Sequence, residues 1–219
     1  MNRCLAVIAL SAMLAGCSGT AIAPPAVDSS SLQAASFSRS HEAARALSKC
    51  PANPNGSGIL PDGDFSRAVD TGHHYTTFYK GQGFAPSWRV VKRTSDFLGS
   101  QWWPVGFCIV DLDGINVGGI GHSGFRTIPG TMYTVTFMLS GNSDCPPTVK
   151  TMIVTAAHQS GKFTWNVANG NDAQHDKFGA ESWSFVAAGH VSTLEFLSED
   201  PRGNRGCGAV VGFIAVAPS

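Results

Sequence analysis

From Ile59 onward the chain alternates short runs of strand-forming residues with clusters of turn-forming residues, and this alternation constrains the fold most. In the run Met132–Leu139 (MYTVTFML), Tyr133, Val135 and Phe137 fall on one face and the threonines fall on the other. A period of two residues is typical of a half-buried strand. Similar runs are Trp88–Lys92, Phe107–Leu112, Val149–Thr155, Phe163–Val167, Ser182–Ala187, Val191–Leu197 and Ala209–Val216.

The segments between these runs are rich in turn residues and show no helical periodicity. They include the sequences PG at 129–130, SGNS at 140–143, NGND at 169–172 and PRGN at 201–204. The 25 glycines and 12 prolines of the chain suit short strands joined by turns. We therefore predict an all-β domain, a sandwich or a jelly roll, rather than βαβ units.

Composition limits the partners of this domain. Hydrophobic residues make up 43% of the chain, which is enough to form a core. The formal net charge is zero, so the chain lacks the basic surface that nucleic-acid binding requires, and we expect no nucleic-acid partner.

Residues 1–16 have the features of a signal peptide. Arg3 supplies the positive charge, and Leu5–Leu14 is an apolar run too short to span a bilayer. The following LAGC at 14–17 resembles a lipobox, the site at which bacterial lipoproteins are lipidated and cut before the cysteine. The alternative is an ordinary secretory signal in which Cys17 is incidental. We predict a lipidated Cys17 that anchors an exported protein to the membrane of the cell envelope.

Residues 17–49 are predicted to form the lipidated N-terminus and a tether. Ser18 follows the cysteine where an Asp would resemble an inner-membrane retention signal, so we expect the outer membrane if the cell is Gram-negative. Residues 18–31 have a linker composition, and Ser40–Leu47 could form a short helix capped by Ser40. The β-sandwich domain is then expected to span residues 50–219.

Four cysteines remain in the mature domain, namely Cys50, Cys108, Cys145 and Cys207. An even number of cysteines in an exported chain indicates two disulfides, for which three pairings exist. A zinc site of thiolates is the alternative, but the chain has no Cys-x-x-Cys pair.

Three segments together resemble a known family. They are LPDGDF at 60–65, IVDLDG at 109–114 with IPGTMYTVTF at 128–137, and EDP at 199–201 with CGAVVGFIAV at 207–216. This pattern resembles the bacterial choice-of-anchor C proteins and the plant cell-wall proteins of the domain-of-unknown-function 642 family. The resemblance covers about residues 59–216 and implies a galactose-binding-like jelly-roll β-sandwich.

The resemblance also implies cysteine pairing and function. Relatives carry cysteines at the positions of Cys145 and Cys207, so this pair would be bridged and Cys50 would pair with Cys108. The relatives are extracellular proteins without known catalysis, and plant members are linked to wall polysaccharide.

Related modules hold a structural Ca²⁺, and two carboxylates that would help to bind it are replaced here. The position of a Glu in relatives is Ser66, and the position of an Asp in the last strand is Gly212. Calcium needs several oxygen ligands, and Asp62 and Asp64 are the carboxylates that remain. We therefore expect no cofactor and regard a structural Ca²⁺ as a weak alternative.

Binding of a sugar requires an exposed aromatic ring together with polar groups that reach its hydroxyls. Adjacent strand residues point to opposite faces, so Trp102 and Trp103 cannot both enter the core. The segment Gly72–Phe84 is predicted to be a loop. The ligand-binding candidates are Trp102, Trp103, His73, His74, Tyr75, Tyr79, Asp111 and Asp113, whereas Trp88, Trp165 and Trp183 are expected in the core.

Catalytic motifs are weak in this chain. The sequence GIGHSG at 119–124 has the letters of a dinucleotide-binding loop, but no helix follows it. It also resembles half of a nucleophile elbow, although Phe125 occupies the second glycine position. We therefore predict a non-catalytic envelope lipoprotein that binds carbohydrate or glycan. The alternatives are a structural lipoprotein that binds an envelope protein and, third, a hydrolase with two distant carboxylates.

Overall fold

The structure is a computed structural model that describes residues 49–102, 106–169, 177–201 and 206–219. They belong to the compact unit Arg45–Ser219. The predicted signal peptide, Cys17, the tether helix and Trp103 lie outside the described residues.

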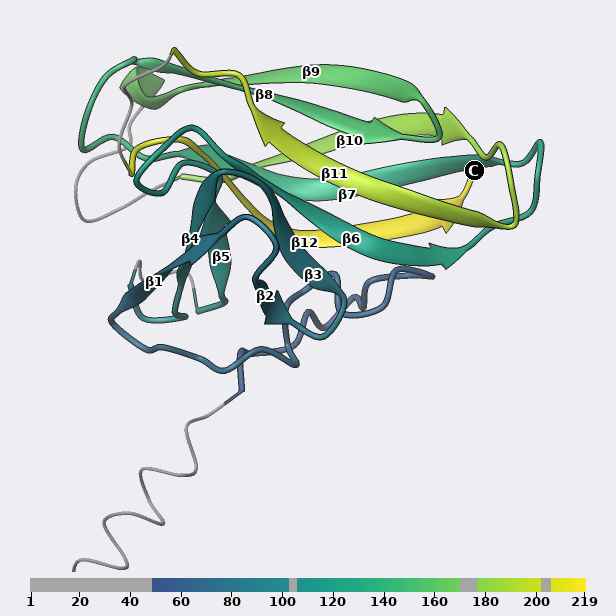
Figure 1. Ribbon diagram of the computed structural model, residues 1–219, viewed down its shortest axis with the longest axis horizontal. Coiled ribbons are helices and arrows are strands. Elements are labelled where there is room, and N and C mark those ends of the chain that lie inside the picture. The colour runs from purple at the N-terminus through teal and green to yellow at the C-terminus, as the bar shows by residue number, and fades with distance from the viewer. Residues whose placement is uncertain (1–48, 103–105, 170–176, 202–205) are drawn as a thin grey trace, which may run out of the picture. The chain divides into compact units, whose positions relative to one another are not determined.

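The described chain forms two six-stranded sheets that pack face to face (Figure 1). All strand pairs within the sheets are antiparallel. The first sheet has the order β1 (Tyr75–Tyr79), β4 (Thr94–Leu98), β5 (Ile109–Asp111), β12 (Ala209–Pro218), β7 (Met132–Gly141), β10 (Gly179–Val186). The second has the order β2 (Gly83–Ala85), β3 (Trp88–Lys92), β6 (Gly119–Arg126), β11 (Val191–Ser198), β8 (Val149–Ala156), β9 (Gln159–Asn166). The predicted all-β jelly-roll sandwich is confirmed.

The core lies between the two sheets because apolar side chains alternate along each strand. In β7 the side chains of Tyr133, Val135, Phe137 and Leu139 are all buried, as their period of two predicts. A smaller apolar cluster covers the opposite, outer face of the first sheet. It contains Leu98, Phe107, Ile109 and Val210, with Phe178 and Phe213 packed against it.

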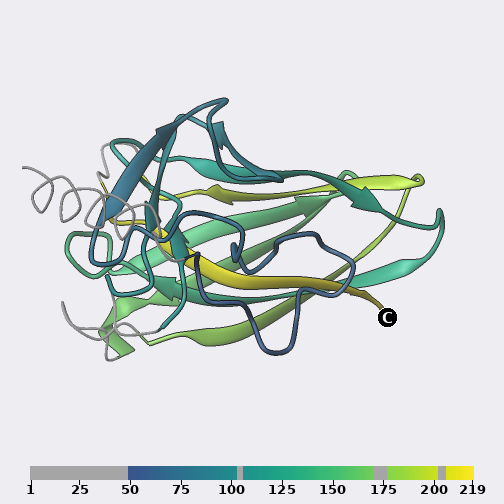
Figure 2. The same cartoon turned by 90° about the horizontal axis from the view of Figure 1, so that it is seen from below.

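The segment that precedes β1 runs alongside β12 (Figure 2). The Ile59 amide donates to the Val216 carbonyl, and the Ile214 amide donates to the Gly63 carbonyl. A Cβ atom at Gly63 would lie 2.0 Å from the Ile214 carbonyl oxygen, so only glycine allows this close approach.

Both disulfides are present with the pairing that the family resemblance implies. Cys50 is bonded to Cys108, and Cys145 is bonded to Cys207. The first joins the N-terminal segment to the residue before β5, and the second joins the loop after β7 to the residues before β12.

The prediction of a loop over Gly72–Phe84 was wrong, because this segment contains β1 and β2. Both are edge strands, and β1 has little burial, so its pattern does not alternate clearly. Strand β4 was not predicted because its five residues are all buried, which removes the alternation of a half-buried strand. The glycine-rich motif at 119–124 is part of strand β6.

The three tryptophans expected in the core differ in burial. Trp88 is 1% exposed, whereas Trp165 and Trp183 are half-buried side chains at one edge of the sandwich. Each ring lies over a glycine of the other sheet's edge strand, Trp183 over Gly161 and Trp165 over Gly179. These rings therefore close the open edge between β9 and β10.

Candidate functional site

A cleft of about 300 Å³ lies on the outer face of the first sheet, beside the ends of β4 and β5. Antiparallel pairing aligns Tyr75 with Leu98 and Asp96 with Asp111, so the side chains of these four residues share one face. Loops that follow β4 and β7 and precede β12 complete the walls. The lining residues are Tyr75, Asp96, Leu98, Trp102, Asp111, Asn142, Asp144, Gly206 and Cys207.

Two aromatic rings form one wall of the cleft. Tyr75 and Trp102 pack edge to face, with ring centroids 5.1 Å apart and an interplanar angle of 85°. Tyr75 is 51% exposed and Trp102 is 37% exposed. The pair therefore keeps aromatic surface in contact with solvent.

Asp70 holds the loop that carries Trp102. Its carboxylate accepts hydrogen bonds from the Ser100 amide, the Ser100 hydroxyl and the Gly72 amide. The backbone of this loop is further held by bonds from the Gln101 amide to Gly72 and from the His73 ring to the Gln101 carbonyl. Burial alone would raise the pKa of Asp70, but the hydrogen bonds outweigh it and lower the pKa. The charged form of Asp70 thus fixes the aromatic wall.

Asp96 lies on β4 in the floor of the cleft. The residue is 9% exposed, and its Oδ1 atom is buried without a hydrogen-bond partner. Desolvation raises the pKa of Asp96; a hydrogen bond with Thr77 opposes this shift, and the charge of Asp113 adds to it. The floor therefore contains a carboxyl group that is only partly satisfied by the protein.

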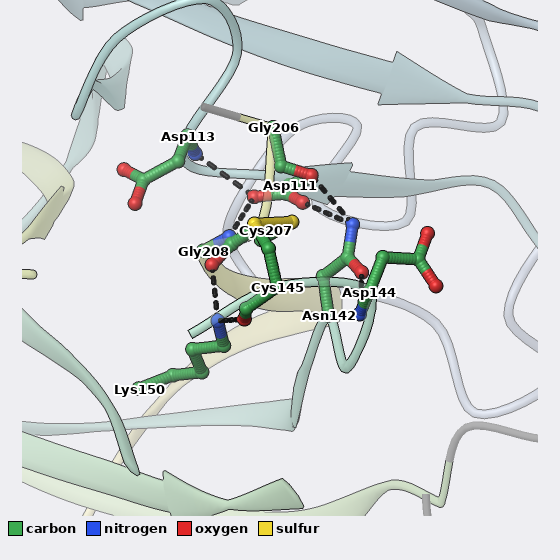
Figure 3. The surroundings of a disulfide bond; sticks show 9 residues. All are labelled: Asp111, Asp113, Asn142, Asp144, Cys145, Lys150, Gly206, Cys207 and Gly208. Atoms are coloured by element: carbon green, nitrogen blue, oxygen red, sulfur yellow. Dashed lines mark hydrogen bonds between the residues drawn. A yellow bond between two sulfur atoms is a disulfide. The ribbon is translucent and has the colours of Figure 1, made fainter. Parts of the chain in front are cut away.

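Asp111 lies beside Asp96 but is fully engaged within the protein (Figure 3). Its Oδ1 accepts from the amides of Asp113 and Gly208, and its Oδ2 accepts from the Asn142 side chain at 3.1 Å. Burial, followed by the charge of Asp113, raises the pKa of Asp111 well above its ordinary value. Asp111 therefore joins β5 to the loops that precede β12 and follow β7.

Asn142 and Asp144 bring polar groups to the opposite wall. The Asn142 side-chain amide donates to Asp111 and to the Gly206 carbonyl, while its oxygen accepts from the Asp144 amide (Figure 3). The Asp144 side chain is exposed at the rim. The strand order places β1 and β7 on opposite sides of β4, β5 and β12. A neutral amide and an exposed carboxylate therefore line the side of the cleft away from the aromatic pair.

Beneath this wall, a buried lysine supports the second disulfide (Figure 3). The Lys150 amine donates to the carbonyls of Cys145 and Cys207 at 2.8 and 2.5 Å. Desolvation lowers the pKa of Lys150, and the nearby carboxylates of Asp200, Asp111, Asp113 and Asp144 oppose that shift. Lys150 therefore fixes the backbone on both sides of the disulfide.

The structure brings three of the sequence candidates together in this cleft, namely Tyr75, Trp102 and Asp111. The exposed His73, His74 and Tyr79 do not line it, and Trp103 lies outside the described residues. Asp113 is fully buried, and its carboxylate points away from Asp111 (Figure 3). It accepts from the Gly118 amide, in keeping with the turn role that the sequence suggests.

Sequence reasoning missed Asp96, Asn142 and Asp144. Asp96 lies on the unpredicted strand β4, so its cross-strand partner was unknown. A usable signal existed for the other two, because the Cys145–Cys207 pairing places residues 142–144 beside residues 206–208.

The calcium candidates Asp62 and Asp64 fit a metal ion poorly. Both oxygens of Asp64 accept backbone amides, from Asn53 and Ser66. Asp62 accepts the Arg67 amide, and only its buried Oδ2 has no partner. One open oxygen does not provide the six to eight ligands that calcium takes.

The sequence GIGHSG at 119–124 has a structural role in β6. His122 is buried, its Nε2 donates to the Pro61 carbonyl, and its Nδ1 accepts the Gly124 amide. Burial lowers the pKa of His122, which favours this neutral form. Ser123 is exposed on the strand, without the strand-to-helix turn of a nucleophile elbow.

Among the described helices, none is long and apolar enough to cross a membrane.

Residues 58–217 match the family model described as "Protein of unknown function (DUF642)". The chain belongs to the DUF642 family. This match covers both sheets of the sandwich. None of the curated proteins matches the chain.

Solved structures with similar folds include carbohydrate-binding modules. One is a CBM4 with 10% identity and a TM-score of 0.43, which covers 73% of this chain and 99% of that chain. Another is CBM35 from Paenibacillus barcinonensis, with 13% identity, a TM-score of 0.40, and coverage of 66% and 99%. A third is TmCBM61 in complex with β-1,4-galactotriose, with 12% identity, a TM-score of 0.40, and coverage of 74% and 99%.

Proposed function

We propose that this DUF642 protein is a non-catalytic lipoprotein of the cell envelope that binds carbohydrate in the cleft beside β4 and β5. The observation that carries the proposal is the placement of the Tyr75–Trp102 pair opposite Asn142 and Asp144, with Asp96 in the floor. Aromatic rings cover the apolar face of a sugar, and amide and carboxylate groups bind its hydroxyls. The cleft offers both kinds of group on rigid supports.

Rigidity favours this function, because a prearranged site loses little conformational entropy when a ligand binds. Hydrogen bonds to Asp70 hold the loop of Trp102, and the Cys145–Cys207 disulfide lies next to Asn142 and Asp144. The two walls of the cleft are therefore fixed independently of each other.

The test is retention of the mature protein on insoluble polysaccharides and glycan arrays. We expect Trp102→Ala to weaken binding of a retained glycan at least about tenfold, as expected for a central aromatic contact. Tyr79→Ala is the matched control, because Tyr79 is equally exposed on the same strand as Tyr75 but does not line the cleft. Binding at this cleft would be refuted if Trp102→Ala and Tyr79→Ala lost equal amounts of glycan affinity, or if Trp102→Ala left retention unaffected.

A second function, binding of an envelope protein, is supported by an apolar groove elsewhere on the sandwich. The groove is lined by Ile59, Ile128, Tyr133, Val191 and Pro218, with Arg126, Thr127 and His190 beside them. Ile128 is 65% exposed and Val191 is 64% exposed. If Ile128→Ser abolishes crosslinking to an envelope protein in cells while no glycan is retained, this alternative replaces the carbohydrate proposal.

A further inference from the structure

The charged side chains among the described residues of the cleft are all acidic. Among the described residues that line it, three carry carboxylates, Asp96, Asp111 and Asp144, and none carries a cation. A carboxylate on the ligand would therefore meet like charge in a partly desolvated site, which costs binding free energy. The described side chains of the lining therefore disfavour acidic sugars such as uronates.

The three carboxylates are not equivalent. Asp111 is saturated by three hydrogen bonds from the protein and has a structural role. Asp96 is more than nine-tenths buried and lines the cleft from β4. Its Oδ1 is enclosed beside Gly114 without a hydrogen-bond partner, and its Oδ2 lies toward Gly206 of the cleft lining. Asp144 lies exposed at the rim. A buried carboxylate is stabilised by a cation within hydrogen-bond distance, so Asp96 favours a ligand that brings a positive charge.

The aromatic wall is also suited to a ligand that carries a positive charge. The faces of tryptophan and tyrosine rings attract ammonium groups and also cover the apolar face of a sugar ring. Tyr75 and Trp102 can therefore contact the ring of an amino sugar while Asp96 and Asp144 lie opposite its amine.

We propose that the cleft recognises glycans whose sugar units carry a protonated primary amine, as in glucosamine oligosaccharides, and that it excludes polyuronates. This inference rests on the proposed carbohydrate function and specifies its ligand class. Asp96 is the specificity-determining residue, Asp144 guides the cationic ligand to the rim, and Trp102 contacts the sugar ring.

The experiment compares four probes of equal length by calorimetry with the mature protein in slightly acidic buffer. They are oligomers of glucosamine, N-acetylglucosamine, galacturonate and lysine. We expect the glucosamine oligomer to bind about tenfold more tightly than its acetylated counterpart, the worth of one charge-assisted hydrogen bond. We expect no binding of the galacturonate oligomer, and we expect added salt to reduce the preference for the amine.

Substitutions that remove one charge but keep the shape of the side chain test the contribution of charge to ligand preference. Asp96→Asn should abolish the preference for glucosamine over N-acetylglucosamine. Far-UV circular dichroism and a urea unfolding curve show independently that the variant is folded. Glu199→Gln is the matched control, since Glu199 is an exposed acid outside the cleft, and its preference should equal that of the wild type.

The outcomes distinguish this inference from the proposed function. Equal affinity for glucosamine and N-acetylglucosamine oligomers, with loss of both in Trp102→Ala, overturns the amine preference but keeps carbohydrate binding. Tight binding of the lysine oligomer shows recognition of the amine alone and overturns the assignment to amino sugars. Absence of binding to every probe, together with no retention on any glycan, overturns both proposals.

Discussion

Asp96 and Asp111 are cross-strand partners on one face of the first sheet, yet their surroundings assign them different roles. Asp111 accepts three hydrogen bonds from the protein, whereas the Oδ1 of Asp96 accepts none. A buried polar group that the protein leaves unsatisfied destabilises the fold. Under the proposed function, a cationic ligand beside this carboxylate would offset part of that destabilisation.

The raised pKa of Asp96 predicts how the free energy of unfolding changes with pH. The pKa of Asp96 is higher in the folded state than the ordinary value of 3.8. At a pH between 3.8 and the raised pKa, the folded protein therefore holds a proton on Asp96 that the unfolded chain releases. Because of Asp96, the free energy of unfolding of the wild type therefore decreases as the pH rises through this window. We expect the free energy of unfolding of Asp96→Asn, minus that of the wild type, to increase between about pH 4 and 7, as measured by urea titrations.

The comparison with the variant is needed because His122 acts in the opposite direction. Its lowered pKa makes the protein more stable as the pH rises toward 6.5, and this contribution is the same in both proteins. A difference that stays constant with pH would show that Asp96 does not carry a raised pKa.

A second prediction concerns Lys150. Lys150→Met removes the donor to the Cys145 and Cys207 carbonyls and a cation that interacts with the carboxylates of Asp200 and Asp111. We expect a loss of about 3 kcal/mol in the free energy of unfolding. Lys162→Met, at an exposed position on β9, should change the free energy of unfolding by less than about 0.5 kcal/mol. Similar losses in the two variants would contradict the assigned role of Lys150.

At the level of elements, the cleft is made by loops that a covalent bond joins. Residues after β7 carry Asn142 and Asp144, residues before β12 carry Gly206, and Cys145–Cys207 connects the two segments. Because β7 and β12 are paired neighbours, the end of one strand meets the start of the other. The disulfide therefore stabilises both the fold and one wall of the site.

Removal of the Cys145–Cys207 disulfide should lower the free energy of unfolding by a measurable amount. The cysteines are 62 residues apart, and the loop-entropy relation gives about 4 kcal/mol for a loop of this length. We expect this loss of unfolding free energy in the double variant Cys145→Ser, Cys207→Ser, measured by urea unfolding. The Cys50–Cys108 pair closes 58 residues, so its removal should cost nearly the same. A much larger loss for Cys145–Cys207 would show that the bond also maintains the network around Asp111.

At the level of the whole domain, the cleft and the apolar groove lie at opposite ends of the same strands. Strand β7 begins near Tyr133 in the groove and ends before Asn142 in the cleft. Strand β12 runs in the reverse direction, from Ala209, which follows Cys207 of the cleft, to Pro218 in the groove. A glycan at one end and a protein at the other could therefore be bound without steric conflict. Such an arrangement suits a module that is attached to an envelope surface.

Attachment itself is a prediction from the sequence. We expect the mature protein to begin at an acylated Cys17 and to remain with the membrane fraction, because several acyl chains anchor a protein stably. Intact-mass spectrometry and fractionation of cells check both points. The variant Cys17→Ser should lack the lipid, whereas Cys4→Ser, within the leader, should mature normally. A mature protein that retains residues 1–16 would contradict the lipoprotein proposal.

The sequence by itself determined the all-β class, most strands of the sandwich and the family, because these depend on local alternation and on motifs read along the chain. Strand Trp88–Lys92 was predicted with its observed bounds, and the disulfide pairing followed from the resemblance. Strand β4 was missed because burial on both faces erases the pattern on which prediction depends.

Only the tertiary structure decided which side chains meet. Tyr75, Asp96, Trp102 and Asn142 come from four separate segments, and no local pattern records that antiparallel pairing aligns Asp96 with Asp111. It also distinguished Asp111 from Asp113, two residues apart, because both are buried but only Asp111 borders the cleft. Contacts between distant segments follow from strand register and packing, and these depend on the whole chain.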